Sequence, residues 1–267
     1  MEKIALVTGS SRGIGRAVAA ELARQGWAVC INYRVREDCA RSLLEQLTAE
    51  GCRAMMVRAD VSQRDQVEAM VRRVEDTFGP VSLLVNNAGI DTQPSAPPEV
   101  SGPFENFPEE IFREVVDVNL VGTFLACQAV GARMVKAGKG GSIINVGSIY
   151  GMLSPIQDIY AYKKEMTGVP FIKPVAYSAA KSGIYNLTRY LATYWGKQGI
   201  RVNTLTPAGV WRDTQDEIFQ ANFCARMPVG RMSQENEYNG ALIFLASQAS
   251  SFMTGSNLVI DGGWTAW

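Results

Sequence analysis

Two kinds of segment alternate along the chain. Short apolar runs rich in β-branched residues are separated by longer stretches in which apolar residues recur every three or four positions. The runs predict buried strands and the stretches predict amphipathic helices. This alternation is typical of an α/β fold whose parallel sheet is covered by helices on both faces. The predicted strands are Ile4–Thr8, Ala28–Tyr33, Ala54–Arg58, Ser82–Asn86, Ser142–Val146, Arg201–Thr206 and Asn257–Ile260, and the predicted helices are Gly13–Gln25, Glu37–Glu50, Arg64–Phe78, Glu109–Lys136, Val175–Gln198 and Gln234–Ser247.

A glycine-rich turn joins the first strand to the first helix, over residues 8–15, Thr-Gly-Ser-Ser-Arg-Gly-Ile-Gly. The N–H groups and the dipole of a helix N-terminus attract an anion, and glycines let a pyrophosphate come close to the backbone. A tight structural turn is the simpler alternative. The strand before the turn and the helix after it are, however, the context that a dinucleotide site requires. We therefore expect a dinucleotide to bind here, through Gly9, Ser11, Arg12, Gly13, Ile14 and Gly15.

Three long segments, residues 90–107, 149–174 and 208–233, carry no regular pattern. The first is rich in proline, and the other two are rich in aromatic residues. Segments of this length within a folded domain are typically functional, and ligands of parallel sheets bind beyond the carboxyl ends of the strands. We expect these segments to form the substrate loops of a single domain that spans residues 1–267.

Composition excludes several classes of function. The chain has 267 residues, 47% of them hydrophobic, and its 26 basic residues balance 26 acidic ones, so nothing favours nucleic acid or an anionic membrane as a partner. No long apolar run reaches the length of a membrane span, and residues 1–3 do not resemble the start of a signal peptide, so we expect a cytoplasmic protein. Five cysteines without paired spacing predict reduced thiols. The lack of histidine excludes His-based triads and His-ligated metals, and no metal site is expected.

Four polar residues are candidates for acid–base chemistry. Tyr177 and Lys181 lie four positions apart and so share one face of a helix, where the cation would lower the pKa of the phenol toward working pH. The alternative is a core tyrosine and a surface lysine. Ser148 follows the fifth strand and could hydrogen-bond a substrate carbonyl, or simply cap a helix. Asn119 lies inside a predicted helix, where asparagine is unfavourable, and could hold a water in a proton chain or bond to the local backbone.

These features occur in the order found in the short-chain dehydrogenase/reductase family, and the chain resembles its short single-domain branch over nearly its whole length. The resemblance implies a doubly wound, Rossmann-type sheet of seven parallel strands and hydride transfer to or from a nicotinamide cofactor. The motifs that carry the resemblance are residues 8–15, Asp60-Val61, Asn86-Asn87-Ala88-Gly89, Asn119, Ser148, and Tyr177 with Lys181.

The resemblance also implies a role for each matched residue. Tyr177 is implied to be the general acid–base, and Ser148 to hold the carbonyl. Lys181 is implied to bind the nicotinamide ribose and to lower the pKa of Tyr177, and Asn119 to anchor a water relay. Further contacts with the cofactor are implied for Asp60 and Val61, which would edge the adenine, for Asn87, Ala88 and Gly89, and for Pro207 and Val210 after the sixth strand.

The end of the second strand indicates which nicotinamide binds. An acidic residue there would bind the ribose 2′-hydroxyl and select NAD(H), but the chain reads Asn32-Tyr33-Arg34. Arg12 and Arg34 could instead grip a 2′-phosphate, because guanidinium pairs well with phosphate. The alternative is two solvated arginines. We expect NADP(H), with NAD(H) as the other possibility.

The expected activity is NADP(H)-dependent reduction of a ketone to a secondary alcohol. The first ninety residues are most similar to 3-oxoacyl-acyl-carrier-protein reductases, and the later part is similar to reductases of bacterial surface-sugar synthesis. One alternative is therefore a dehydrogenase of a sugar or sugar-nucleotide hydroxyl, and another is a non-catalytic NADP(H)-binding sensor. Lys136 and Lys139 are candidates for an acyl-carrier-protein docking patch, with solvated helix-end lysines as the simpler reading. The family implies a homodimer or homotetramer.

Overall fold

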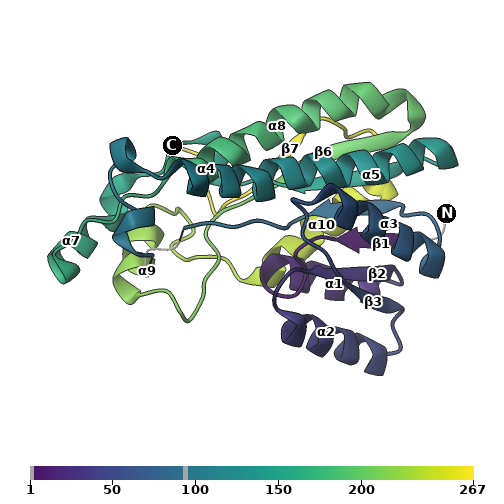
Figure 1. Cartoon of the computed structure of the whole chain (residues 1–267), viewed down its shortest axis with the longest axis horizontal. Coiled ribbons are helices and arrows are strands. Elements are labelled where there is room, and N and C mark those ends of the chain that lie inside the picture. The colour runs from purple at the N-terminus through teal and green to yellow at the C-terminus, as the bar shows by residue number, and fades with distance from the viewer. Residues whose placement is uncertain (1–2, 93–95) are drawn as a thin grey trace.

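Seven parallel strands form one sheet in the described part of the chain, residues 3–92 and 96–267 of a computed structural model (Figure 1). Met1, Glu2 and residues 93–95 of the proline-rich segment lie outside it. The sheet order is β3-β2-β1-β4-β5-β6-β7, so the predicted Rossmann-type α/β fold is confirmed. The strands are β1 (Ile4–Val7), β2 (Ala28–Tyr33), β3 (Ala54–Arg58), β4 (Leu83–Asn86), β5 (Gly141–Val146), β6 (Ile200–Pro207) and β7 (Asn257–Ile260).

The direction of winding reverses between β1 and β4, which are hydrogen-bonded neighbours although they are far apart in sequence. At such a switch point the connections leave toward opposite faces, and a crevice opens beyond the carboxyl ends of the strands. The first helices after β1 and β2 are α1 (Gly13–Arg24) and α2 (Glu37–Ala49). The crevice is therefore bordered by the glycine-rich turn on one side and by the segment that follows β4 on the other.

Helices cover both faces of the sheet (Figure 1). One apolar core lies between the sheet and α1, α2 and α10 (Asn239–Ala246). The other lies under the opposite group of helices, and burial of these two faces supplies the apolar driving force for folding. That group consists of α3 (Arg64–Phe78), α4 (Glu109–Val116), α5 (Gly122–Ala137) and α8 (Val175–Trp195).

The predicted helix Glu109–Lys136 is interrupted. Residues Asp117–Val121 form a π-helical turn, η3, between α4 and α5. A π-turn widens the helix by one residue and is frequent at functional sites, and this one carries Asn119. By length and composition the whole stretch Glu109–Ala137 could cross a membrane, contrary to the expectation from sequence, but 61% of its most apolar window is buried inside the protein. Its apolar character is that of a helix packed on the sheet.

Two other predicted helices differ from the structure at one of their ends. The stretch predicted to run from Val175 to Gln198 is α-helical only to Trp195 and closes with a 3-10 turn, Gly196–Gln198. The stretch predicted over Gln234–Ser247 begins as a 3-10 turn, Glu235–Tyr238, before α10. Terminal turns of this kind follow from the unpaired backbone groups at helix ends, which periodicity does not reveal.

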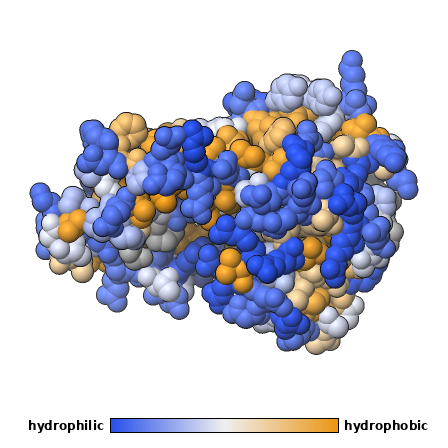
Figure 2. Space-filling model, in the orientation of Figure 1, coloured by the Kyte–Doolittle hydropathy of each residue, from blue (hydrophilic) through white to orange (hydrophobic). Residues whose placement is uncertain are grey.

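The three segments expected as loops contain short helices of their own. The later two pack together around a third, aromatic-rich core that includes Tyr160, Phe171 and Phe223. Figure 1 shows α7 and α9 beyond the end of the sheet, and the face seen in Figure 2 is mainly hydrophilic with apolar residues in small groups. The short helices are η1 (Pro98–Val100), η2 (Phe104–Asn106), α6 (Ile149–Met152), η4 (Gln157–Tyr160), α7 (Tyr162–Thr167) and α9 (Glu217–Cys224).

Candidate functional site

A cleft of about 650 Å³ runs along the carboxyl ends of the strands, from the glycine-rich turn to the aromatic segments. It brings together nearly all of the residues that the sequence singled out. Gly15 and Asn119 are the two predicted site residues that do not line it. The predicted residues that do are Gly9, Ser11, Arg12, Gly13, Ile14, Arg34, Asp60, Val61, Asn87, Ala88, Gly89, Ser148, Tyr177, Lys181, Pro207 and Val210.

The glycines of the turn are required by its geometry. Gly9 and Gly13 have φ angles of 61° and 62°, a region that side-chain-bearing residues rarely adopt. A Cβ on Gly9 would lie 2.7 Å from the Cα of Ala88. A Cβ on Gly15 would collide with the amide of Asn87. Gly15 therefore serves close packing against the segment after β4, and the rest of the turn lines the cleft, as a bound pyrophosphate would require.

Hydrogen bonds fasten this turn to the segment after β4. The Thr8 hydroxyl accepts from the backbone N–H groups of Asn87 and Ala88 at 3.0 and 3.1 Å. The Asn87 amide donates in return to the carbonyls of Thr8 and Gly9 at 3.0 and 2.9 Å. Across the turn, Oδ1 of Asn32 accepts from the N–H of Gly9 at 3.0 Å. These hydrogen bonds hold the glycine-rich turn and the segment after β4 at a fixed separation across the cleft.

Three arginines gather at the end of β2, where the predicted site expects an adenosine ribose. Arg12, Arg34 and Arg36 all line the cleft. Arg34 lies 3.5 Å from Asp60, whose other oxygen accepts from the Ser62 N–H and hydroxyl. Ser62 is therefore occupied by Asp60, and α3 begins without a side-chain cap. Arg36 is paired with Asp38 at 2.9 Å, so two of the three guanidiniums at this end already contact a carboxylate.

Lys181 is buried under the middle of the cleft. Its Nζ donates to the carbonyl of Val146, the last residue of β5, at 2.7 Å. Only 4% of the residue is exposed, and this burial lowers the pKa of Lys181 to about 8, although the negative charge of Asp91 opposes the shift. The surface lysine that was the simpler alternative is therefore wrong.

The environment of Tyr177 differs from the expectation. Burial raises the pKa of its phenol above the ordinary value, the negative charge of Asp91 raises it further, and a hydrogen bond with Ser148 lowers it. The Lys181 ammonium lies 5.9 Å from the centroid of the Tyr177 ring. The expected lowering of the phenol pKa by Lys181 is thus wrong, because desolvation and the charge of Asp91 dominate. Tyr177 is a neutral phenol at working pH.

Ser148 caps a helix, one of the two roles that the sequence left open, and it also lines the cleft. It is the N-cap of α6, and its hydroxyl accepts from the backbone N–H of Tyr150 at 3.2 Å. Its backbone is clamped by Tyr185, whose hydroxyl donates to the Ser148 carbonyl at 2.7 Å and accepts from the Ser148 N–H at 3.3 Å. Tyr185 lies on α8 eight residues after Tyr177, a spacing that could have drawn attention to it.

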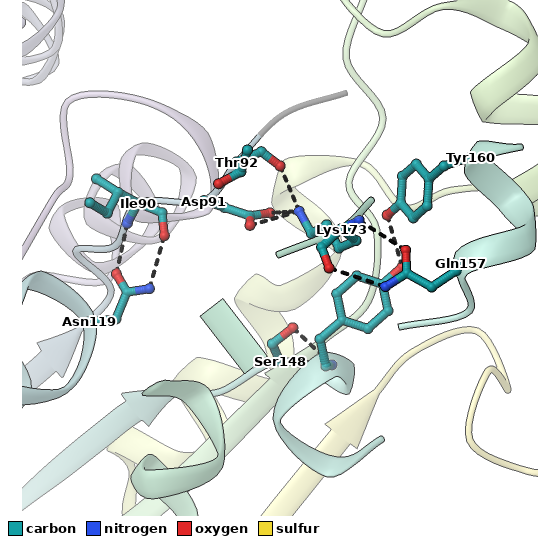
Figure 3. A network of polar contacts seen from close by, with 9 residues as sticks. Ile90, Asp91, Thr92, Asn119, Ser148, Gln157, Tyr160 and Lys173 are labelled. Carbon is teal, nitrogen blue, oxygen red and sulfur yellow. Dashed lines mark hydrogen bonds and ion pairs between the residues drawn. The ribbon is translucent and has the colours of Figure 1, made fainter. Parts of the chain in front are cut away.

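Asn119 acts on the backbone next to the cleft. Its Oδ1 accepts from the Ile90 N–H at 2.8 Å, and its Nδ2 donates to the Ile90 carbonyl at 2.9 Å (Figure 3). The π-turn aims the amide at the start of the segment that follows β4. The side chain thus holds the backbone of Ile90, and Asn119 positions the start of this segment beside the cleft.

The chain is similar to known proteins in sequence and in structure. A family model described as enoyl-(acyl carrier protein) reductase matches residues 9–265. A gluconate 5-dehydrogenase of Gluconobacter oxydans is 37% identical over 98% of this chain and 94% of its own length. A 3-oxoacyl-[acyl-carrier-protein] reductase of Staphylococcus aureus is 31% identical over 98% of both chains. A gluconate 5-dehydrogenase from Burkholderia cenocepacia, solved in complex with NADP and tartrate, is 34% identical, with a TM-score of 0.85 over 100% of this chain and 97% of its own.

The chain belongs to the short-chain dehydrogenase/reductase family. It is an NAD(P)-dependent oxidoreductase. Lys136 and Lys139, the candidates for a carrier-protein patch, are exposed but lie near the end of α5, just before the amino end of β5. That end of the sheet is opposite to the cleft, so the structure favours solvated helix-end lysines.

Two parts of this dehydrogenase site were missed from the sequence. Asp91 and Lys173 form an ion pair in the cleft wall, although 82 positions separate them. Arg212 lies at the other end, where one of its guanidinium nitrogens would be 3.8 Å from a Cβ on Gly13. No local pattern marks any of the three, because each is brought to the cleft by the folding of a long segment.

The buried ammonium of Lys181 makes stability depend on pH. Its pKa in the folded chain, about 8, is below the ordinary value of 10.5, so between these pH values the unfolded chain binds more protons. The free energy of unfolding of the wild type, relative to a Lys181→Met variant, should therefore rise by about 1–3 kcal/mol from pH 7.5 to pH 10.5. Urea denaturation across this range measures it.

The wild type and Lys181→Met share their cysteines and tyrosines. The difference between their free energies of unfolding therefore cancels the titration of those groups. The exposed Lys197 gives the matched control: Lys197→Met removes an ammonium that is not buried, and it should change the free energy of unfolding by less than about 0.5 kcal/mol. A difference for Lys181→Met that does not change with pH would contradict the burial of a charged Lys181.

Proposed function

We propose that the protein is an NADP(H)-dependent enzyme that interconverts a ketone and a secondary alcohol. The observation that carries this proposal is the shared cleft: Ser148, Tyr177 and Lys181 line one end of the space whose other end is the glycine-rich turn. A dinucleotide seated on the turn would extend toward these three side chains. A bound nicotinamide would supply or accept the hydride.

In reduction, the neutral phenol of Tyr177 is the general acid that gives a proton to the developing alkoxide. The Ser148 hydroxyl holds the carbonyl oxygen and stabilises negative charge there, and its backbone is already fixed by Tyr185. The Lys181 ammonium supplies a positive charge near Tyr177, and its hydrogen bond to the Val146 carbonyl keeps it in place. In the alcohol-oxidising direction the Tyr177 phenolate left by that transfer takes the proton back from the alcohol.

NADP(H) is the proposed cofactor, with NAD(H) as the alternative. The end of β2 offers the Asn32 amide, engaged with Gly9, and no carboxylate that would repel a 2′-phosphate. Arg12 and Arg34 line the cleft nearby, so their charge favours the phosphorylated nucleotide. Asp60 partly neutralises Arg34, which makes Arg12 the freer of the two guanidiniums.

A sugar or polyol is the second candidate for the substrate. The relatives named gluconate 5-dehydrogenase favour it, and the 3-oxoacyl-[acyl-carrier-protein] reductase favours the ketoacyl alternative. A non-catalytic NADP(H) sensor would not need Ser148, Tyr177 and Lys181 in one cleft. We further propose a cytoplasmic, single-domain protein that associates with copies of itself through α8, where the stacked rings of Tyr190 and Tyr194 are each 62% exposed.

Replacing Tyr177 with phenylalanine removes the proton donor and leaves the shape of the cleft. Turnover with NADPH and a ketone should fall by about 100- to 10,000-fold, while the dissociation constant for NADPH stays within about threefold of the wild type. Stopped-flow absorbance and fluorescence titration measure the two. Tyr190→Phe on the same helix is the control and should retain activity. Near-wild-type turnover of Tyr177→Phe would show that another group donates the proton.

Replacing Arg34 with aspartate tests the cofactor assignment. A carboxylate at this position repels a 2′-phosphate and accepts from a 2′-hydroxyl, so the ratio of kcat/KM for NADPH to that for NADH should fall by at least about tenfold. Arg72→Asp, an equal change of charge on the exposed side of α3, should leave the ratio unaltered. An unchanged ratio in Arg34→Asp would reject the role of Arg34.

A further inference from the structure

The wall of the cleft beside Tyr177 contains a buried ammonium whose donors are all in use. Nζ of Lys173 contacts Oδ1 and Oδ2 of Asp91 at 2.7 and 2.6 Å and the carbonyl of Thr92 at 2.8 Å. An ammonium has three N–H groups, so these three acceptors satisfy it. Its side chain is 4% exposed. Lys173 is therefore not available to a ligand unless the ion pair breaks.

Both partners of this pair are anchored through their backbones. Gln157 accepts from the Lys173 N–H at 2.9 Å and donates to the Lys173 carbonyl at 3.1 Å. On the other side, Asn119 holds both backbone groups of Ile90, the residue before Asp91. Figure 3 shows the two anchors on either side of the ion pair. The pair thus joins the segment after β4 to the segment before α8 in a fixed geometry.

The position of the pair puts it next to the reacting group. The Lys173 ammonium lies 5.7 Å from the centroid of the Tyr177 ring, and Asp91, Lys173 and Tyr160 line the same cleft as Tyr177. The influence of Asp91 reaches the acid–base pair, since its charge raises the pKa of Tyr177 and opposes the lowering of the pKa of Lys181. A substrate bound at Tyr177 must therefore contact this wall or lie close to it.

The Asp91 carboxylate, and not the Lys173 ammonium, is the group of this ion pair that a substrate in the cleft can contact. The Asp91 side chain keeps 28% exposure, against 4% for Lys173. A carboxylate carries about four acceptor sites, of which Lys173 takes two, so acceptor capacity remains. It can receive hydrogen bonds from hydroxyl groups. A carboxylate on the substrate would meet a like charge there, and to reach Lys173 it would have to displace Asp91 and leave that charge unpaired.

We infer that Asp91 determines substrate specificity: held by Lys173, its carboxylate accepts a hydrogen bond from a substrate hydroxyl, so the enzyme takes uncharged, hydroxyl-bearing alcohols or ketones and rejects analogues that carry a carboxylate at that position. This inference rests on the proposed function and narrows its substrate class. Two relatives are named for gluconate, which carries a carboxylate, whereas this inference predicts uncharged substrates for the present chain.

Substrate pairs in which a carboxylate replaces an uncharged hydroxyl or hydroxymethyl group test the inference on the unaltered protein. The pairs are D-glucitol with D-gluconate, and cis-1,4-cyclohexanediol with cis-4-hydroxycyclohexanecarboxylate. Oxidation is followed by NADPH absorbance with NADP⁺ as acceptor. In each pair where turnover is seen, kcat/KM for the uncharged member should be at least about tenfold higher. Equal values, or preference for the acid, would overturn the inference.

The panel separates failure of the inference from failure of the proposed function. Cyclohexanol and cyclohexanone are included as substrates without a second polar group. Turnover of these two, with none of either pair, would contradict the inference and support the proposed function. No turnover of any alcohol or ketone in the panel, with either nicotinamide, would count against both.

Asp91→Asn then tests the residue itself. Losing the charge should lower kcat/KM for the uncharged member of each pair, raise it for the acid by exposing Lys173, and so shift the ratio by at least about tenfold toward the acid. Asp158→Asn in η4, the same change at an exposed residue outside the cleft wall, should keep the wild-type ratio.

The double variant Asp91→Asn with Lys173→Gln covers the case in which Asp91→Asn does not fold, because it leaves no unpaired buried charge. It should bring the ratio between uncharged and acid substrates close to one. A ratio that stays at the wild-type value in either variant would show that another part of the cleft selects the substrate.

Discussion

The contact between the Lys181 ammonium and the Val146 carbonyl is the constraint on which the site depends. A charged group can be buried only where hydrogen bonds replace its water, and the end of a strand supplies such an acceptor. The contact joins α8 to β5 and, together with the apolar packing of α8 on the sheet, holds this face of α8 toward the cleft. Tyr177, one turn earlier, reaches the cleft, and Tyr185, one turn later, holds the backbone of Ser148. The geometry of the proposed catalytic residues therefore follows from how α8 packs on the sheet.

The two ends of the cleft are built on different principles. At the cofactor end, backbone groups and small residues dominate, because glycines at positive φ and the bonds between Thr8 and Asn87 leave room for a ligand to touch the main chain. The substrate end is walled by the long segments, which bring their own aromatic core and the pair of Asp91 and Lys173. The first end is common to proteins that bind a dinucleotide. We propose that the second gives this member of the family its own selectivity.

Much of this arrangement could be predicted from sequence because it is encoded locally. The strands, the glycine turn and the Tyr177–Lys181 spacing each depend on neighbouring residues, and the structure brings them together as the topology requires. What could not be predicted depends on distant partners. The pKa of Tyr177 is set by burial and by Asp91, and the amide of Asn119 is occupied by Ile90, 29 positions away. The short helices of the later segments pack on the aromatic-rich core, which no periodic pattern of apolar residues in the sequence predicts.

The central claim is that the glycine turn and the Tyr177 group act on one ligand in one cleft, and a crystal structure with NADP⁺ tests it most directly. The account predicts the pyrophosphate at the backbone N–H groups of the turn, the nicotinamide between Ser148 and Lys181, and the Tyr177 hydroxyl directed at the face of the cleft where substrate binds. A nicotinamide outside this end of the cleft, or a Tyr177 hydroxyl directed away from it in the complex, would contradict the account.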